Sequence, residues 1–296
     1  MQFGIENMSI WDDIKYTFKE GSVLTRLIYI NLGVFLLIKL AGVLFYLAGQ
    51  PFSFAEWLSV PSQLNELRIK PWTPVTYMFL HTGFLHLLFN ILGLYWFGKL
   101  FLYHFEGDKL LGLYLLGGIS GALVYVLAYN IFPVFASVNG LLLGASASVF
   151  AILTAVAVYD PNREIHLLFI GPVALKYVAA FYVILSIVGI SSSNPGGNLA
   201  HLGGATWGWF YIFQLRRGRD WGAGLIRFIN QLGHWFKPKS KLKVSYKQPP
   251  RNDYEYNRYK NEQQEELNHI LDKIAKSGYD SLSKKEKEIL FRQGKK

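Results

Sequence analysis

The sequence predicts an all-α membrane protein: a bundle of six transmembrane helices with an amphipathic first loop and a small cytoplasmic helical tail. Three observations predict this fold class. The chain of 296 residues is 51% hydrophobic. Only 17% of its residues are charged, against about 25% in soluble domains. Its apolar residues gather in runs that are separated by polar segments, which is typical of a protein that crosses a membrane several times.

Charge is distributed unevenly along the chain. Residues 1–215 hold 10 basic and 10 acidic residues, whereas residues 216–296 hold 20 basic and 10 acidic residues. Residues 1–24 are polar and lack the apolar core of a signal peptide, so we expect a cytoplasmic N-terminal segment. The absence of cysteine excludes disulfides, thiol catalysis and thiolate metal sites. We expect no metal or other cofactor.

The spans are predicted from apolar length, because a transmembrane helix needs about 20 mostly apolar residues. The six predicted spans are Leu27–Leu47, Phe84–Tyr103, Leu110–Ile131, Leu141–Tyr159, Tyr177–Ile190 and Leu199–Leu215. The fifth is the shortest. Lys39 lies in the middle of the first span, where its amine either snorkels to the interface or faces the bundle.

The orientation follows from basic residues, which are enriched in cytoplasmic loops. Basic residues flank the loops after the second and fourth spans and follow the sixth span: Lys99, Lys109, Arg163, Lys176, Arg216, Arg217 and Arg219. The loops 132–140 and 191–198 carry no charge. We therefore expect a multi-pass protein of the cell (inner) membrane with both termini in the cytoplasm.

The first loop, Gln50–Thr82, contains an amphipathic and aromatic stretch, Pro51–Val60, that is too short to span a membrane. We expect this stretch to lie in the outer interface, where Trp57 would anchor it. An ordinary extracellular loop is the alternative.

Two apolar runs carry polar residues of a kind used in catalysis. Ser146 lies among small residues in the fourth span, and His201 lies in a similar setting in the sixth. Polar groups inside the hydrocarbon region are costly, so they usually face the bundle interior and serve function. A serine hydroxyl is a weak nucleophile until a base takes its proton, and histidine is the commonest such base. This pair predicts hydrolysis inside the bilayer.

A third polar cluster lies at the start of the second span. His86 and Asn90 are four residues apart and therefore share one helix face. Side chains of these types can donate hydrogen bonds to the oxyanion of an acyl transfer. Each residue has an ordinary alternative, a hydrogen bond across the bundle. Three helices that each offer a catalytic-type residue favour the catalytic interpretation.

Glycines four residues apart allow membrane helices to approach closely. Gly117 and Gly121 form such a pair in the third span, where generic packing is the simpler explanation. Gly204 and Gly208 form another in the sixth span, beside His201. We expect close packing at this second pair to bring the histidine towards the fourth span.

At these residues the sequence resembles the rhomboid intramembrane serine proteases, over residues 25–217 and all six spans. The matching motifs are His81-x4-His86-x3-Asn90, Gly144-Ala145-Ser146-Ala147 and Ala200-His201-x-Gly203-Gly204-x3-Gly208. They occur in the order that the family shows, and Gly144 would support the nucleophile.

The resemblance implies a Ser–His dyad of Ser146 and His201 without an aspartate. It also implies an oxyanion hole formed by His86, Asn90 and the backbone amide of Ser146. Phe150 stands where the family often has an aromatic residue that packs on the catalytic histidine.

The chain departs from the family pattern at two places. Ala147 replaces the usual glycine after the nucleophile, and alanine is an accepted variant. Pro71-Trp72-Thr73 stands where many members have Trp-Arg in the first loop. Arg68 or Lys70 is the candidate to replace that arginine.

The depth of the site can be estimated from helix geometry. A fourth helix from Ser146 to Tyr159 would end just before Asp160-Pro161, because proline disfavours helix at the preceding residue. Its 14 residues would rise about 21 Å, so Ser146 would lie roughly 10 Å below the outer face of a ~30 Å core. Free amides at the helix N-terminus would then point at the reacting centre. Ser191–Gly197 would act as a flexible lid over a water-filled cavity.

The tail is predicted as two parts. Residues 218–260 read as a basic juxtamembrane segment and linker, with interfacial aromatics at Trp221, Phe228, Trp235 and Phe236. Residues 261–296 read as a helical hairpin of Glu265–Lys276 and Ser283–Gln293, the second opened by a capping box of Ser283 and Glu286. This hairpin resembles the cytoplasmic extension of some bacterial rhomboids, and its partner cannot be inferred. No nucleic acid is expected, because acidic residues are interspersed among the basic ones.

The sequence therefore predicts a serine endopeptidase that cleaves transmembrane protein substrates. A catalytically inactive relative that binds membrane proteins is the rival, but such relatives generally lack the serine or the histidine. A transporter is disfavoured because charged residues are nearly absent from the spans.

Overall fold

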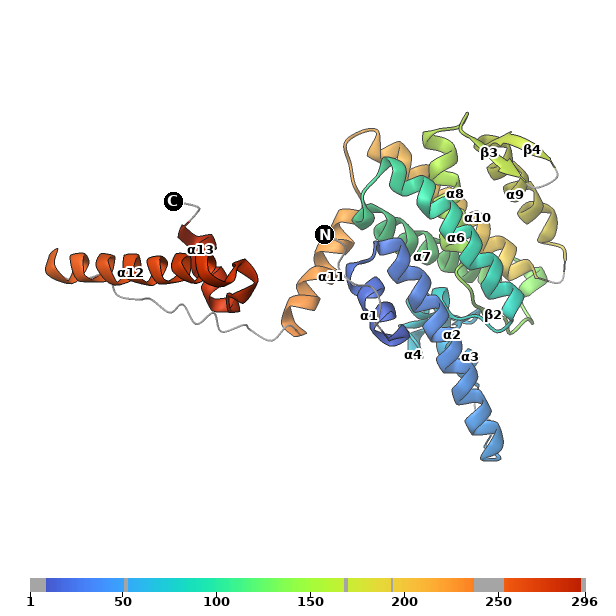
Figure 1. Cartoon of the computed structure of the whole chain (residues 1–296). Coiled ribbons are helices and arrows are strands. Elements are labelled where there is room, and N and C mark those ends of the chain that lie inside the picture. Colours follow the sequence, from blue (N-terminus) through green and yellow to red (C-terminus); the bar gives the residue numbers. More distant parts are fainter. Residues whose placement is uncertain (1–8, 51–52, 168–169, 193, 237–252, 294–296) are drawn as a thin grey trace. The chain divides into compact units, whose positions relative to one another are not determined.

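The structure is a computed structural model that describes residues 9–50, 53–167, 170–192, 194–236 and 253–293. It divides into two compact units, residues 1–237 and 238–296, and both are drawn in Figure 1. The helices of the first unit are α1 (Ile10–Glu20), α2 (Val23–Leu47), α3 (Phe54–Leu58), α4 (Leu64–Ile69), α5 (Thr73–Thr76), η1 (Tyr77–Phe79), α6 (Phe84–His104), α7 (Gly107–Ile131), η2 (Pro133–Phe135), α8 (Ser146–Tyr159), α9 (Leu175–Gly189), α10 (Pro195–Leu215) and α11 (Gly222–Phe236).

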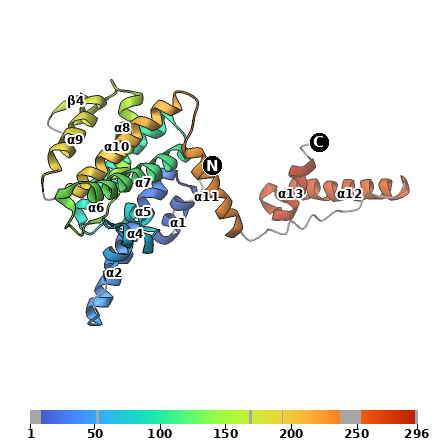
Figure 2. The same ribbon diagram turned by 180° about the vertical axis from the view of Figure 1, so that it is seen from behind.

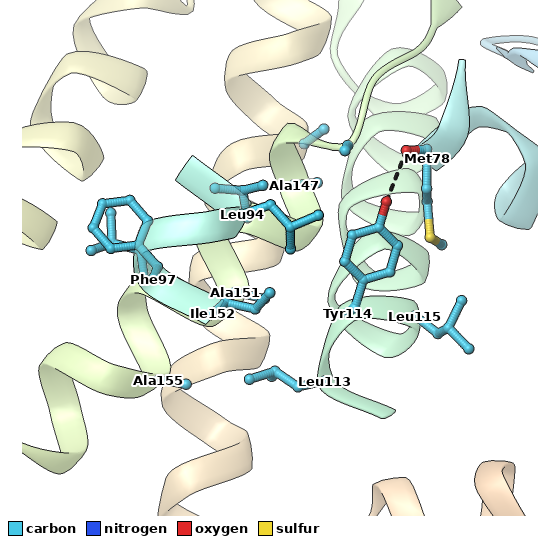
Figure 3. Close-up of a cluster of buried hydrophobic side chains, with 14 of the residues drawn as sticks. Met78, Leu94, Phe97, Leu113, Tyr114, Leu115, Ala147, Ala151, Ile152 and Ala155 are labelled. Atoms are coloured by element: carbon cyan, nitrogen blue, oxygen red, sulfur yellow. Dashed lines mark hydrogen bonds between the residues drawn. The ribbon is translucent and has the colours of Figure 1, made fainter. Parts of the chain in front are cut away.

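The centre of this unit is formed by three helices, α7, α8 and α10, which contact one another more extensively than any other elements do. Small residues make this possible: Ala147, Ala151 and Ala155 are buried at four-residue intervals along α8. Figure 3 shows them beside the apolar side chains of α6 and α7, with the Tyr114 hydroxyl donating to the Met78 carbonyl at 3.0 Å. Ser146 and His201 therefore belong to two of these three closely associated helices.

Three of the described helices, α2, α6 and α7, are long and apolar enough to cross a membrane by length and composition. The helices α8 and α9 are shorter and apolar, with 14 and 15 residues. The helix α10 has 21 residues, which is long enough to span a membrane, but its glycines and polar residues lower its mean hydropathy, and it is not among these three. The second half of α2 projects beyond the other helices of its unit in both views (Figures 1 and 2), and its large side chains are exposed there. A count of six spans stays a prediction.

Several predicted span starts differ from the helices, since α2 begins four residues before Leu27, and the starts of the fourth and sixth spans bear on the site. The fourth helix begins at Ser146 and not at Leu141, because Leu141–Leu142 forms strand β2 and pairs with β1, Val60–Pro61, in the first loop. The helix of Ser146–Tyr159 that sets the expected depth of the site is confirmed. The sixth helix begins at Pro195 and not at Leu199, because the Asn194 side chain caps it by accepting from the amide of Gly197 at 3.0 Å.

The predicted lid is accordingly shorter. Residues 195–197 form the first turn of α10, and Ser193 lies outside the described residues. A Cβ at Gly196 would come within 2.8 Å of the Tyr125 ring. This half of the predicted lid is therefore packed helix rather than flexible loop.

The first loop folds into the short helices α3, α4 and α5. The indole of Trp72 donates to the carbonyl of Trp57 at 2.8 Å. The amine of Lys70 donates to the carbonyl of Glu56 at 2.9 Å, so Lys70 ties the end of α4 to α3. Whether Arg68 or Lys70 replaces the missing arginine stays a prediction. Of the amphipathic stretch, residues 51–52 lie outside the described residues.

Lys39 of α2 reaches across to the chain that enters α6. Its amine donates to the carbonyl of Thr82 at 2.7 Å. This contact favours the bundle-facing alternative over snorkelling.

Several elements of the first unit were not predicted, among them α1, a β-hairpin and α11. The helix α1 is amphipathic and capped by Ser9. A hairpin of β3 (Glu164–Leu167) and β4 (Gly171–Ala174) joins α8 to α9. The helix α11 begins beside Asp220, whose carboxylate accepts from the amide of Gly222 at 2.9 Å. The helix α1 and the two four-residue strands are short, whereas α11 is an amphipathic helix of 15 residues.

The segment predicted to lie at the membrane surface coincides with α11. Trp221 and Phe228 are exposed there. The side chains of Trp235 and Phe236 and all of residues 237–252 lie outside the described part of the chain.

The second unit contains α12 (Asp253–Ser277), η3 (Tyr279–Ser281) and α13 (Lys284–Gln293). The first helix starts 12 residues earlier than Glu265, where an ion pair of Arg258 and Glu262 at 3.0 Å supports it. Ser283 and Glu286 bond to each other's backbone amides, as a capping box requires. The Lys273 ammonium and the Ser283 contacts hold the pKa of the Glu286 carboxyl at about 2, below its ordinary value.

Candidate active site

Ser146 is the first residue of α8, and the turn before it sets its position. Gly144 has φ +115°, a left-handed conformation that side chains rarely adopt. Its amide donates to the carbonyl of Tyr77 at 2.9 Å, which fixes the turn against the first loop. The chain therefore enters α8 sharply, with the Ser146 amide among the free N–H groups of the helix N-terminus.

His201 lies in the second turn of α10, opposite Ser146. Its Nε2 is 2.8 Å from the Ser146 Oγ. The ring of Phe150 stacks on the imidazole with centroids 4.2 Å apart and planes at 11°. The structure thus brings together the residues expected as nucleophile, base and stacking aromatic, in the geometry that an activated serine needs.

Glycines on α10 permit this approach. A Cβ at Gly204 would overlap the carbonyl oxygen of Ala147, and one at Gly208 would overlap that of Ala151. Because the two backbones touch, the imidazole one turn away reaches α8 without a bridging water.

The two residues expected to bind an oxyanion lie on α6, beside the turn that precedes Ser146. The imidazole of His86 lies over Gly144, where a Cβ would come within 2.8 Å of its Nε2. Asn90 is buried and donates one amide hydrogen to the carbonyl of His86 at 2.8 Å. The second amide hydrogen of Asn90 is left for another acceptor.

His81 contacts the same turn at Ala145. The amide of Ala145 donates to its Nε2 at 3.4 Å, and its ring lies edge-on to that of His86 with centroids 5.1 Å apart. The imidazole therefore holds the backbone immediately before Ser146.

Ser148 faces a different helix. It is fully buried, and a Cβ at Gly118 of α7 would lie 2.7 Å from its Oγ. Ser148 therefore points towards α7, whereas Ser146 points towards His201. This difference makes Ser148 a matched control for substitutions of Ser146.

Sequence reasoning missed two residues of α9. The Oγ of Ser186 lies 3.4 Å from the Nδ1 of His201, and the ring of Tyr182 lies edge-on to Phe150 with centroids 5.8 Å apart. A single serine in an apolar helix usually bonds its own backbone, so nothing in the sequence marked Ser186.

Fold and site together define a class of protein, a helical membrane protein with a serine and a histidine in contact inside the bundle. The sequence model of the Rhomboid domain family matches residues 68–218, half of the chain, and the chain belongs to the rhomboid family. The resemblance predicted from the motifs is confirmed.

A relative and a second family add detail. Over 212 residues the chain is 27% identical to RHOMBOID-like protein 12, mitochondrial, of Arabidopsis thaliana. The match covers 68% of this chain and 60% of the length of that relative. A family of unknown function, DUF6576, matches residues 252–296, which include α12 and α13.

Proposed function

We propose that this protein is an intramembrane serine endopeptidase that cleaves transmembrane segments of membrane proteins. The observation that carries the proposal is the 2.8 Å contact between the Ser146 Oγ and the His201 Nε2 at the N-terminus of a buried helix. Membership of the rhomboid family supports it. A serine held against a histidine in an apolar interior has one evident chemical use, the attack on a carbonyl.

In the proposed reaction, the Ser146 Oγ attacks the scissile carbonyl carbon as its proton passes to the His201 Nε2. The tetrahedral intermediate collapses, the C–N bond breaks, and the imidazolium returns the proton to the leaving amine. A water molecule, deprotonated by the same imidazole, then hydrolyses the acyl-enzyme and restores the Ser146 hydroxyl. The His201 imidazole takes up the proton and returns it in both halves of the reaction. No acidic third residue is therefore required.

The oxyanion would be held by His86, Asn90 and the Ser146 amide. The amide is one of the free donors at the start of α8, where the helix dipole also favours negative charge. His86 and Asn90 share one face of α6 beside this turn. Donors that are fixed before the reaction stabilise the developing charge without reorganisation.

Substrates are proposed to be membrane helices that unwind readily, because a helical backbone hides its carbonyls in hydrogen bonds. The purified protein should cleave a test transmembrane protein in detergent, and mass spectrometry of the products should place the cut in or beside its apolar segment. Binding of such substrates without any cleavage would favour the rival function, an inactive relative that acts as a binding scaffold.

We expect His86→Ala or Asn90→Ala to slow turnover without abolishing it. Removal of one oxyanion donor costs about 10²–10³ in kcat, and these contacts form mainly in the transition state, so KM should change little. Steady-state cleavage of a fluorogenic substrate measures both constants. A rise in KM with an unchanged kcat would assign the two residues to substrate binding instead.

We propose the cell (inner) membrane as the location, with both termini cytoplasmic, because the basic residues flank alternate loops. Reporter fusions at Arg219 and in the Asn194 loop should show opposite sidedness. Reporters on the same side would contradict six spans with this orientation.

The tail is expected to be dispensable for chemistry, because every candidate catalytic residue precedes Arg216. A chain that ends at Lys237, the boundary of the first unit, should cleave the test substrate at a rate close to that of the full chain. Loss of activity in a truncated chain with an unchanged melting temperature would assign the tail a gating role.

A further inference from the structure

The hydroxyl of Ser186 touches the side of the imidazole that faces away from Ser146. Ser186 lies on α9 and is 2% exposed. Its Oγ is 2.9 Å from the carbonyl oxygen of Tyr182, one turn earlier in the helix, and 3.4 Å from the Nδ1 of His201. The same oxygen therefore joins the backbone of α9 to the base on α10.

The directions of these hydrogen bonds follow from the chemistry of the groups. A carbonyl oxygen can only accept, so the Ser186 hydroxyl donates its single proton to Tyr182. Its lone pairs remain for the imidazole, and His201 must then donate from Nδ1. A neutral imidazole with its proton on Nδ1 has its free lone pair on Nε2, which is the nitrogen that faces the Ser146 Oγ at 2.8 Å.

We propose that Ser186 is a positioning residue that holds His201 in the Nδ1–H tautomer, so that Nε2 is free to act as the base. The proposal rests on the proposed function of Ser146 and His201. Ser186 replaces the third group that orients the base in other serine hydrolases, with a neutral hydroxyl that itself is oriented by the helix backbone.

The same contact has a role after proton transfer. Once the Ser146 proton is on Nε2, the ring is an imidazolium and Nδ1–H becomes a stronger donor. The Ser186 oxygen, whose lone pairs face this donor, then stabilises the charge in an apolar interior. Catalytic hydrogen bonds are often long in the resting state and shorten during the reaction, which fits the 3.4 Å distance.

The expected effect of Ser186→Ala is moderate. A third residue that imposes the wrong tautomer costs about 10⁴-fold, but alanine imposes neither tautomer. The change in kcat reflects how much this hydrogen bond strengthens when the imidazole becomes charged, and its loss corresponds to a roughly threefold to tenfold fall. KM should not change, because the hydroxyl does not meet the substrate. Ser186→Thr keeps the hydroxyl and its bond to the backbone four residues earlier, so it should restore the rate.

Nitrogen-15 NMR of the full chain with labelled histidine measures the tautomer without reference to proteolysis, with His201→Gln used to assign the signals. In the wild type, Nδ1 should be protonated and Nε2 bare. Ser186→Ala should show both tautomers, and Ser186→Thr should show the wild-type signals. Ser120→Ala is the matched control, since Ser120 donates to α10 at the Gly203 carbonyl at 2.9 Å and not to the imidazole.

The outcomes separate this proposal from the one on which it rests. A single Nδ1–H tautomer in Ser186→Ala, or an Nε2–H tautomer in the wild type, would overturn the role of Ser186. A fall in kcat equal to that of Ser120→Ala would also overturn it, since both changes would then act only on packing. A wild-type protein whose Ser146 reacts with no fluorophosphonate would instead refute the proposed function, whatever tautomer the histidine shows.

Discussion

Ser146→Ala and His201→Ala should each remove measurable proteolysis while leaving the bundle folded. The hydroxyl and the imidazole are in direct contact, and neither can form an acyl-enzyme without the other. Their losses are therefore expected to be non-additive, and the double variant should be no less active than either single one. Cleavage of a test transmembrane substrate, followed by gel and mass spectrometry, measures the effect.

Ser148→Ala provides the matched control for this experiment. It removes the same hydroxyl from the same helix two residues later, at a side chain that faces Gly118 of α7. We expect it to retain activity. Full activity in Ser146→Ala, or a loss in Ser148→Ala with no loss of folding, would show that the nucleophile has been assigned to the wrong residue.

Gly204→Ala should both destabilise the protein and inactivate it, although it adds a single methyl group. In an open helix the change from glycine to alanine stabilises by about 1 kcal/mol. At Gly204 the new Cβ would overlap the Ala147 carbonyl, so α8 and α10 must move apart. Such overpacking typically costs about 1–3 kcal/mol. A displacement of about 1 Å between reacting groups can cost 10²-fold in rate.

The control for Gly204→Ala is Gly33→Ala. Gly33 is also helical, in α2, and a Cβ there meets no described atom within 4 Å. The melting temperature should therefore fall in Gly204→Ala. In Gly33→Ala it should stay the same or rise. Equal melting temperatures and equal activities would show that α8 and α10 tolerate separation.

The sequence predicted the residues of the site better than the way they are held. Ser146 and His201 could be found because a polar residue is conspicuous in an apolar run. The end of α8 at Tyr159 could be predicted from Pro161, because proline disfavours helix at the residue before it. The contact between Ser146 and His201 depends on helix spacing, and the glycines on α10 indicated where that spacing is small.

Other features of the site could not be read from the sequence because they depend on tertiary contacts. Ser186 has the same local appearance as any serine that bonds its own helix, and its contact with His201 appears only when α9 packs on α10. The two residues of β2 look like part of an apolar span until β1 pairs with them. The early start of α10 was readable in principle, since Asn194-Pro195 is a cap followed by proline.

The most direct test of the central claim is the reaction of the full-length protein with a fluorophosphonate probe, followed by peptide mass spectrometry. Such probes react at an appreciable rate only with a serine whose proton is taken by a neighbouring base. We expect labelling at Ser146 that disappears in His201→Ala and persists in Ser148→Ala. No labelling of the wild type, labelling at Ser148, or undiminished labelling of Ser146 in His201→Ala would contradict a serine activated by His201.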